Sequence, residues 1–132
     1  MADVAFREYL PYHKSPIAAP LVVTDDDPTF TTMNTLVITE NLPAGEYVLT
    51  ICWEWWMADV NDSAMFKIIP PLTLGTVYQH EPKDASEVIV RTAAQPLTYA
   101  GGPVTITTEA SKTAGADDLH INWSTIEFER KA

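Results

Sequence analysis

The feature that most constrains this chain is a strict alternation of side chains that follows the Pro-Ala-Gly turn at residues 43–45. One set of alternate positions is large and apolar: Tyr47, Leu49, Ile51, Trp53 and Trp55. The positions between them are smaller and mixed: Val48, Thr50, Cys52 and Glu54. Since successive side chains of a strand point to opposite faces, this pattern predicts a central strand with one face in a core. Other strands must cover that face.

Further runs rich in β-branched residues follow one another along the chain, with turn signals between them. The predicted strands lie at 35–39, 64–69, 72–78, 86–92, 104–109 and 119–130. Together with the central strand this gives about seven to eight strands, with turns every ~8–12 residues, as in β-sandwiches and barrels. Two segments, 44–50 and 100–106, each place a strand directly after Ala-Gly. That echo favours two similar antiparallel units folded face to face, as in a jelly roll.

The last predicted strand changes parity along its length. Leu119, Ile121 and Trp123 share one face, whereas Ile126 and Phe128 fall on the other. A bulge near residues 124–125 would return the later pair to the core side. We therefore expect an all-β, antiparallel jelly-roll sandwich over residues 35–132, which is one domain of ordinary size.

Residues 1–34 differ from the rest because prolines at 11, 16, 20 and 28 interrupt them. Proline fixes φ and removes a donor, so beyond a short helix at residues 2–10 we expect an extended arm or an edge strand. Its apolar residues are Phe6, Tyr9, Leu10, Tyr12, Ile17, Leu21, Val22 and Val23. Such an arm packs on its own domain or laces onto a neighbouring subunit. We expect the second, with these eight residues as partner contacts, because an isolated segment cannot offset its ordering entropy.

Charge and composition exclude several classes of partner. The net charge is −10, from 18 acidic and 8 basic residues, and the basic ones are scattered. Nucleic acids and anionic membranes carry the same sign, so neither is expected as a partner. No apolar run approaches the ~20 residues of a membrane span, and the N-terminus lacks the features of a signal peptide.

The sequence predicts no enzyme, metal or cofactor. His13, His80 and His120 are dispersed, and none of the usual nucleophile or phosphate-binding motifs is present. Cys52, the one cysteine, is interpreted as a small buried side chain. Three acidic clusters are candidate calcium ligands, although solvated loop carboxylates explain them better: 25–27, 59–62 and 117–118. A glycosidase pair of Glu54 with Asp59 or Asp62 has no spacing to support it.

The tryptophans of the central strand have two interpretations. Flat aromatic faces bind sugar rings, but Trp53 and Trp55 share the apolar face and are predicted to lie in the core. Trp56 has the opposite parity and adjoins a loop, so it is the candidate for an exposed contact with a protein or a sugar.

Three stretches carry a resemblance to a known group of proteins: Leu-Pro-Ala-Gly-Glu-Tyr at 42–47, Leu-Thr-Tyr-Ala-Gly-Gly-Pro-Val-Thr-Ile at 97–106, and the closing strand at 119–130. Residues 35–131 resemble the small jelly-roll domains of tailed-bacteriophage virions, which occur as capsid decoration (cement) proteins and as tail or fibre heads. The resemblance implies no catalytic residues.

What the resemblance implies is a virion structural protein on the capsid exterior, assembled in the host cytoplasm. It would bind the major capsid protein or other virion proteins, as a dimer or trimer, and stabilise the particle through many weak contacts. A negative charge suits the outside of a DNA-filled particle. The alternative is a carbohydrate- or receptor-binding module of a phage tail or fibre.

Overall fold

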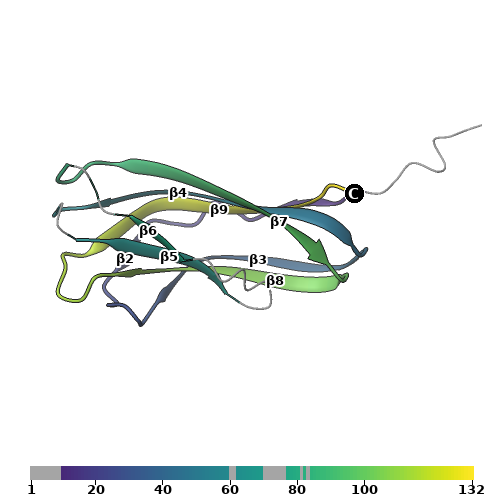
Figure 1. Cartoon of the computed structure of the whole chain (residues 1–132), viewed down its shortest axis with the longest axis horizontal. Coiled ribbons are helices and arrows are strands. Elements are labelled where there is room, and N and C mark those ends of the chain that lie inside the picture. Colours follow the sequence, from purple (N-terminus) through teal and green to yellow (C-terminus); the bar gives the residue numbers. More distant parts are fainter. Residues whose placement is uncertain (1–9, 60–61, 70–76, 81, 83) are drawn as a thin grey trace, which may run out of the picture.

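The computed structural model describes residues 10–59, 62–69, 77–80, 82 and 84–132. These residues form two β-sheets that pack face to face (Figure 1). The strands are β1 (Tyr12–Lys14), β2 (Leu21–Val23), β3 (Thr31–Leu42), β4 (Gly45–Met57), β5 (Ala64–Ile69), β6 (Val77–His80), β7 (Ile89–Tyr99), β8 (Gly102–Lys112) and β9 (Leu119–Arg130). Over the described ranges, no helix is long and apolar enough to cross a membrane.

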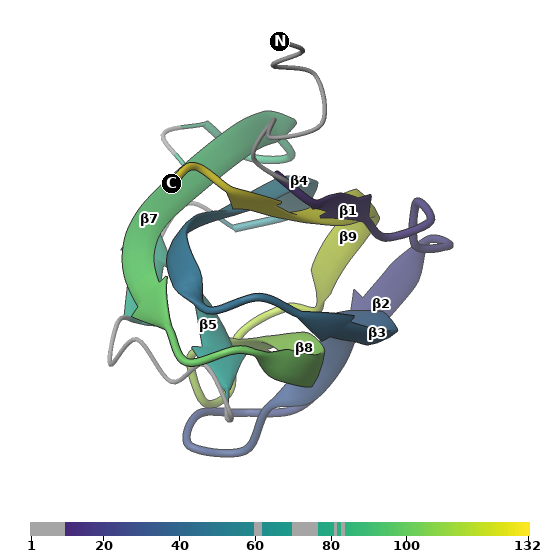
Figure 2. The same ribbon diagram turned by 90° about the vertical axis from the view of Figure 1, so that its right-hand side faces the viewer.

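The strand order is that of a jelly roll. The first sheet runs β1-β9-β4-β7, with β2 also paired to β9, and the second runs β3-β8-β5-β6. The named strands pair antiparallel throughout. Each sheet therefore takes strands from both halves of the chain, and the end view shows the two layers facing each other (Figure 2). The predicted all-β, antiparallel jelly-roll sandwich is confirmed.

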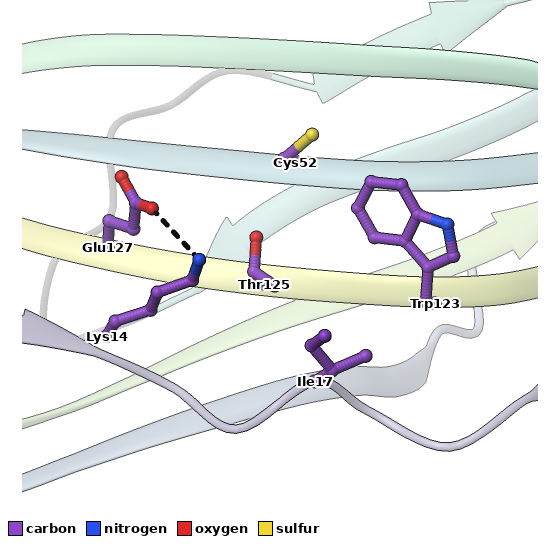
Figure 3. A pocket seen from close by; sticks show the side chains of 6 residues that line it. All are labelled: Lys14, Ile17, Cys52, Trp123, Thr125 and Glu127. Atoms are coloured by element: carbon purple, nitrogen blue, oxygen red, sulfur yellow. Dashed lines mark ion pairs between the residues drawn. The ribbon is translucent and has the colours of Figure 1, made fainter.

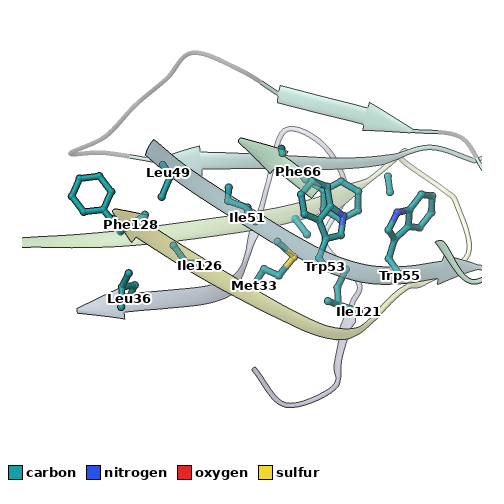
Figure 4. Close-up of a cluster of buried hydrophobic side chains, with 14 of the residues drawn as sticks. Met33, Leu36, Leu49, Ile51, Trp53, Trp55, Phe66, Ile121, Ile126 and Phe128 are labelled. Atoms are coloured by element: carbon teal, nitrogen blue, oxygen red, sulfur yellow. The ribbon is translucent and has the colours of Figure 1, made fainter. Parts of the chain in front are cut away.

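Strand β4 is the centre of the first sheet, as the alternation predicts. It pairs with β7 on one side and β9 on the other. Its five predicted core residues, Tyr47 to Trp55, are at most 3% exposed. Trp53 and Trp55 pack on Phe66 of the second sheet, with ring centroids 4.8 and 5.7 Å apart (Figure 4). The expected core position of both tryptophans is confirmed.

The bulge in β9 lies earlier than expected. The register shifts at β4 residues Glu54 and Trp55, which pair with Trp123 and Ile121, so the extra residue is Asn122. Trp123 consequently faces outward, and the expectation that it lies in the core is wrong. The side chain opposite Trp53 is instead the small Ser124, which leaves room in the core for the Trp53 indole.

The described part of the arm belongs to the first sheet. β1 and β2 pair with β9, and the Ser15 and Ala18 amides donate to the Ile126 and Ser124 carbonyls at 2.8 and 3.1 Å. Residues 10–30 are therefore held by their own domain, and the expectation that they are ordered mainly by other chains is wrong for this range. The predicted helix at residues 2–10 lies outside the described residues except for its last position.

The eight expected partner contacts separate into three groups. Val23 has no exposed surface and lies in the core, so its expected partner role is wrong, and Leu21 packs against the same core. Leu10, Tyr12, Ile17 and Val22 are 47–68% exposed, and their partner role stays a prediction. Phe6 and Tyr9 lie outside the described residues.

A hydrogen-bond network ties the arm to both sheets. The Asn34 side-chain amide on β3 donates to the Ser15 hydroxyl at 3.1 Å and to the Ser124 carbonyl at 2.9 Å. The Ser15 hydroxyl in turn accepts from the Ile126 amide at 2.9 Å. Because Ser15 and Ser124 are buried, these bonds hold the link between β1 and β2 in one place. That link forms a wall of the site described next.

Candidate functional site on the outer face of the first sheet

The outer face of the first sheet carries the β4 positions that lie between the core residues. Side chains of directly paired strand residues share a face. Trp56 therefore lies beside His120, Cys52 beside Thr125 and Thr92, and Thr50 beside Glu127, because these residues are register partners. This face combines two tryptophans with carboxylates and hydroxyls.

An open pocket of about 430 Å³ lies in the middle of this face. Its lining residues come from the arm, β4 and β9: Lys14, Ile17, Cys52, Trp123, Thr125 and Glu127. Figure 3 shows the Trp123 ring at one end of the pocket and the Lys14–Glu127 ion pair, 3.5 Å long, at the other. Ile17, 68% exposed, belongs to the arm, which runs beside β9. The arm thus supplies two of the six lining residues.

Sequence reasoning missed most of this pocket. Only Ile17 among the lining residues was a candidate contact. The conflicting parity of Trp123 and Ile126 was the one available signal, since a bulge placed before Trp123 turns its ring outward.

Cys52 lies on this outer face and is half-buried, so its interpretation as a small buried side chain is wrong. Its sulfur lies 3.3 Å from the Thr92 hydroxyl. The alternation of β4 itself places Cys52 opposite the core residues. Because the thiol lines the pocket, its rate of alkylation should report whether a ligand occupies the pocket.

Trp56, the predicted exposed contact, is half-buried on the same face. Its ring stacks on His120 with centroids 3.8 Å apart and planes 3° apart. Between this stacked pair and the pocket, the Asn122 amide donates to a Glu54 carboxylate oxygen at 2.8 Å. Trp56 remains a candidate contact, now as part of a stacked pair.

Two of the acidic clusters noted in the sequence come together. Asp59, Asp62 and Asp117 place one carboxylate oxygen each within 4.8 Å of one another, and Asp62 accepts the Asp117 amide at 3.0 Å. Such oxygens suit hard cations, but exposed carboxylates often gather without an ion, so the cluster carries no assignment. Asn61 lies outside the described residues.

The first acidic cluster, residues 25–27, has structural partners. The buried Lys112 ammonium donates to Asp26 at 2.7 Å and to the Ala116 carbonyl at 2.8 Å. The hydrogen bond from Lys112 to Asp26 lowers the pKa of the Asp26 carboxyl below its usual value. Asp25 accepts from the Thr31 hydroxyl. These contacts fasten the connection from β2 to β3.

The histidines with described side chains have partners away from the cysteine. His13 lies 3.7 Å from Glu40, and His120 stacks on Trp56. The Cys52 thiol contacts Thr92, a hydroxyl that cannot serve as a general base at neutral pH. Glu54 pairs with Asn122, whereas Asp59 and Asp62 belong to the separate cluster. His13, His120, Cys52 and the three carboxylates named here thus lie in separate contacts within the described part of the chain.

Comparisons with known proteins relate this chain to others through its fold. A scan against protein-family models finds no match, and neither does a search of curated proteins. A solved structure of dimeric latent PorU from Porphyromonas gingivalis is similar, with a TM-score of 0.51 and 7% identity, over 91% of this chain and 13% of that one. A carbohydrate-binding module from Cellvibrio mixtus lichenase 5A in complex with cellotriose covers 89% of this chain and 99% of its own, at 13% identity and a TM-score of 0.33. At 7% and 13% identity, a likeness concerns the fold alone. Of these two structures, the PorU structure, with its TM-score of 0.51, supports a similar fold, whereas the carbohydrate-binding module, at 0.33, carries no argument.

Proposed function

We propose that this chain is a non-catalytic binding module that takes a glycan on the outer face of its first sheet. The observation that carries this proposal is the outward Trp123 ring at the end of an open pocket whose other end holds a charged pair. The apolar faces of sugar rings pack on flat aromatic side chains, while sugar hydroxyls require hydrogen-bonding groups beside them.

The pocket offers both kinds of contact. Trp123 and Ile17 supply apolar surface, Glu127 supplies acceptors, and Lys14 supplies donors. Its volume, about 430 Å³, falls within the range of small-ligand sites. A bulge and an edge strand build most of it, and only Ile17 comes from the short link between β1 and β2, so the pocket rests largely on the sheet.

The first test replaces Trp123 with alanine. We expect wild-type protein to bind members of a glycan array and the variant to lose about tenfold or more in affinity, since an anchoring aromatic contributes more than 1.4 kcal/mol. Calorimetry with the best array ligand measures the change. Val37→Ala is the matched control, because Val37 is 61% exposed on the second sheet.

Cys52 gives an independent readout of the same site. It is the only cysteine in the chain and it lines the pocket, so bound glycan should slow its alkylation. Unchanged affinity in the tryptophan variant, together with unchanged alkylation, would show that the pocket is not the binding site.

A second proposal concerns the biological setting. We propose that the module is a structural protein of a tailed-phage virion, attached as a decoration subunit on the capsid exterior or as part of a tail or fibre. The exposed apolar side chains of the arm favour it, because Leu10, Tyr12, Ile17 and Val22 offer anchors to a neighbouring virion protein or a second copy. The charge of −10 suits an outer surface.

Co-sedimentation with intact phage heads, and separately with tails, tests this setting. A decoration subunit should co-sediment with heads, and Val22→Asp should weaken its retention without lowering the melting temperature, because Val22 is half-exposed. Retention on tails alone would favour the receptor-binding alternative. Absence from both particles would contradict a virion role and leave glycan binding untouched.

A further inference from the structure

We propose that the site is longer than the pocket and takes an uncharged, linear glycan of several sugar units along the strands of the first sheet. This inference rests on the proposed function, since it concerns the same face. It adds the length, direction and charge of the ligand.

Aromatic side chains lie on both sides of the pocket. At one end the stacked Trp56 and His120 are register partners. At the other end, Tyr12 pairs with Glu129, which in turn pairs with Val48 on β4. Tyr12 is 51% exposed and shares the outer face.

The distance between the two ends follows from the register. Trp56 and Val48 are eight positions apart on β4, which corresponds to roughly 26 Å along a strand. That is several times the width of one sugar ring. Trp123 lies between the two ends, so a glycan bound on Trp123 can continue in both directions. The site would therefore bind the interior of a glycan chain and not only its end.

Polar pairs fill the spaces between the rings. Asn122 and Glu54, 2.8 Å apart, lie between the Trp56 stack and Trp123. Lys14 and Glu127, 3.5 Å apart, form the end of the pocket and lie between Trp123 and Tyr12. Carboxylates accept and amide or ammonium groups donate, so each pair can exchange hydrogen bonds with sugar hydroxyls.

The charges of this face select against acidic sugars. Glu54, Glu127 and Glu129 lie on it, and the nearby ammonium groups of Lys14 and Lys131 are already paired with Glu127 and Glu129. An anionic glycan would therefore meet repulsion here, which the net charge of −10 reinforces. An uncharged glycan meets no such penalty.

The experiment measures affinity against chain length. Cello-, xylo- and manno-oligosaccharides, each from disaccharide to hexasaccharide, are titrated into the full chain by calorimetry, with oligogalacturonides of the same lengths as the charged series. For at least one neutral series we expect affinity to rise about tenfold or more with length, and the charged series to bind more weakly.

Variants at the two ends identify the longer site. Tyr12→Ala and Trp56→Ala should remove the gain with length while leaving disaccharide binding unchanged, and Tyr12→Phe should restore the gain because it keeps the ring. Equal affinity for every length, or tighter binding of the charged series, would overturn the inference. Disaccharide binding that still depends on Trp123 would leave the proposed function standing. Failure of every oligosaccharide to bind would end both proposals.

Discussion

Replacing Trp53 with alanine should lower the free energy of unfolding by about 3–5 kcal/mol, because the change leaves a large cavity in the core. The indole is 1% exposed and packs on Phe66 of the opposite sheet, so its loss removes contact between the two layers. The core around it is held by strands on both sides and cannot collapse freely. Chemical denaturation followed by circular dichroism measures the loss.

Trp56→Ala is the matched control for this prediction. Both tryptophans lie on β4, but Trp56 faces outward and stacks on His120. Its replacement should cost about 1.5 kcal/mol or less, the range for one aromatic pair at a partly exposed site. Equal losses at the two positions would mean that burial on β4 does not follow the observed alternation.

The position of the central strand could be predicted because its pattern is redundant. Five large apolar residues at every second position allow only one face of β4 to be buried, and a shift by one residue would expose all of them. The order of strands within each sheet was not predicted, but the even spacing of strands and turns indicated a sandwich or barrel, and the Ala-Gly echo favoured a jelly roll. These are local signals that a single sequence carries in full.

The bulge and the arm could not be placed in the same way. A bulge in β9 needs only one extra residue between Ile121 and Ile126, and several positions satisfy the parity. With the bulge at Asn122, the small Ser124 pairs with Trp53 on the neighbouring strand β4, a contact distant in sequence. The arm carried no alternation long enough to indicate a strand, since β1 and β2 each have three residues.

The candidate site was hidden for the same reasons. The pocket is formed by the arm, the bulged part of β9 and the outer side of β4. Its two charged lining residues, Lys14 and Glu127, are 113 positions apart in the sequence. Neither carries a motif. Trp56 was found because parity and its neighbouring loop singled it out, whereas Trp123 was assigned to the core.

Deleting residues 1–30 should prevent the remaining chain from folding as a stable monomer. The deletion removes β1 and β2, takes the fully buried Val23 out of the core and leaves the buried Lys112 without Asp26. It also exposes the edge of β9, whose backbone groups then lose their partners on the arm. Loss of both the core contact and the edge pairing exceeds what most single substitutions cost. Thermal melts of the full-length and shortened chains measure the effect.

A peptide added in trans distinguishes loss of the edge strand from a general effect of shortening. Residues 10–30 as a synthetic peptide should restore a cooperative melt, because β1 and β2 pair with β9 through backbone bonds that need no covalent link. The same peptide with Val23→Asp should fail, whereas Val22→Asp should succeed, since Val23 is buried and Val22 is 51% exposed. A shortened chain that melts like the full-length protein would contradict this account and return the arm to the role of a free attachment segment. Rescue by both peptides would mean that backbone pairing alone holds the edge and that Val23 contributes little.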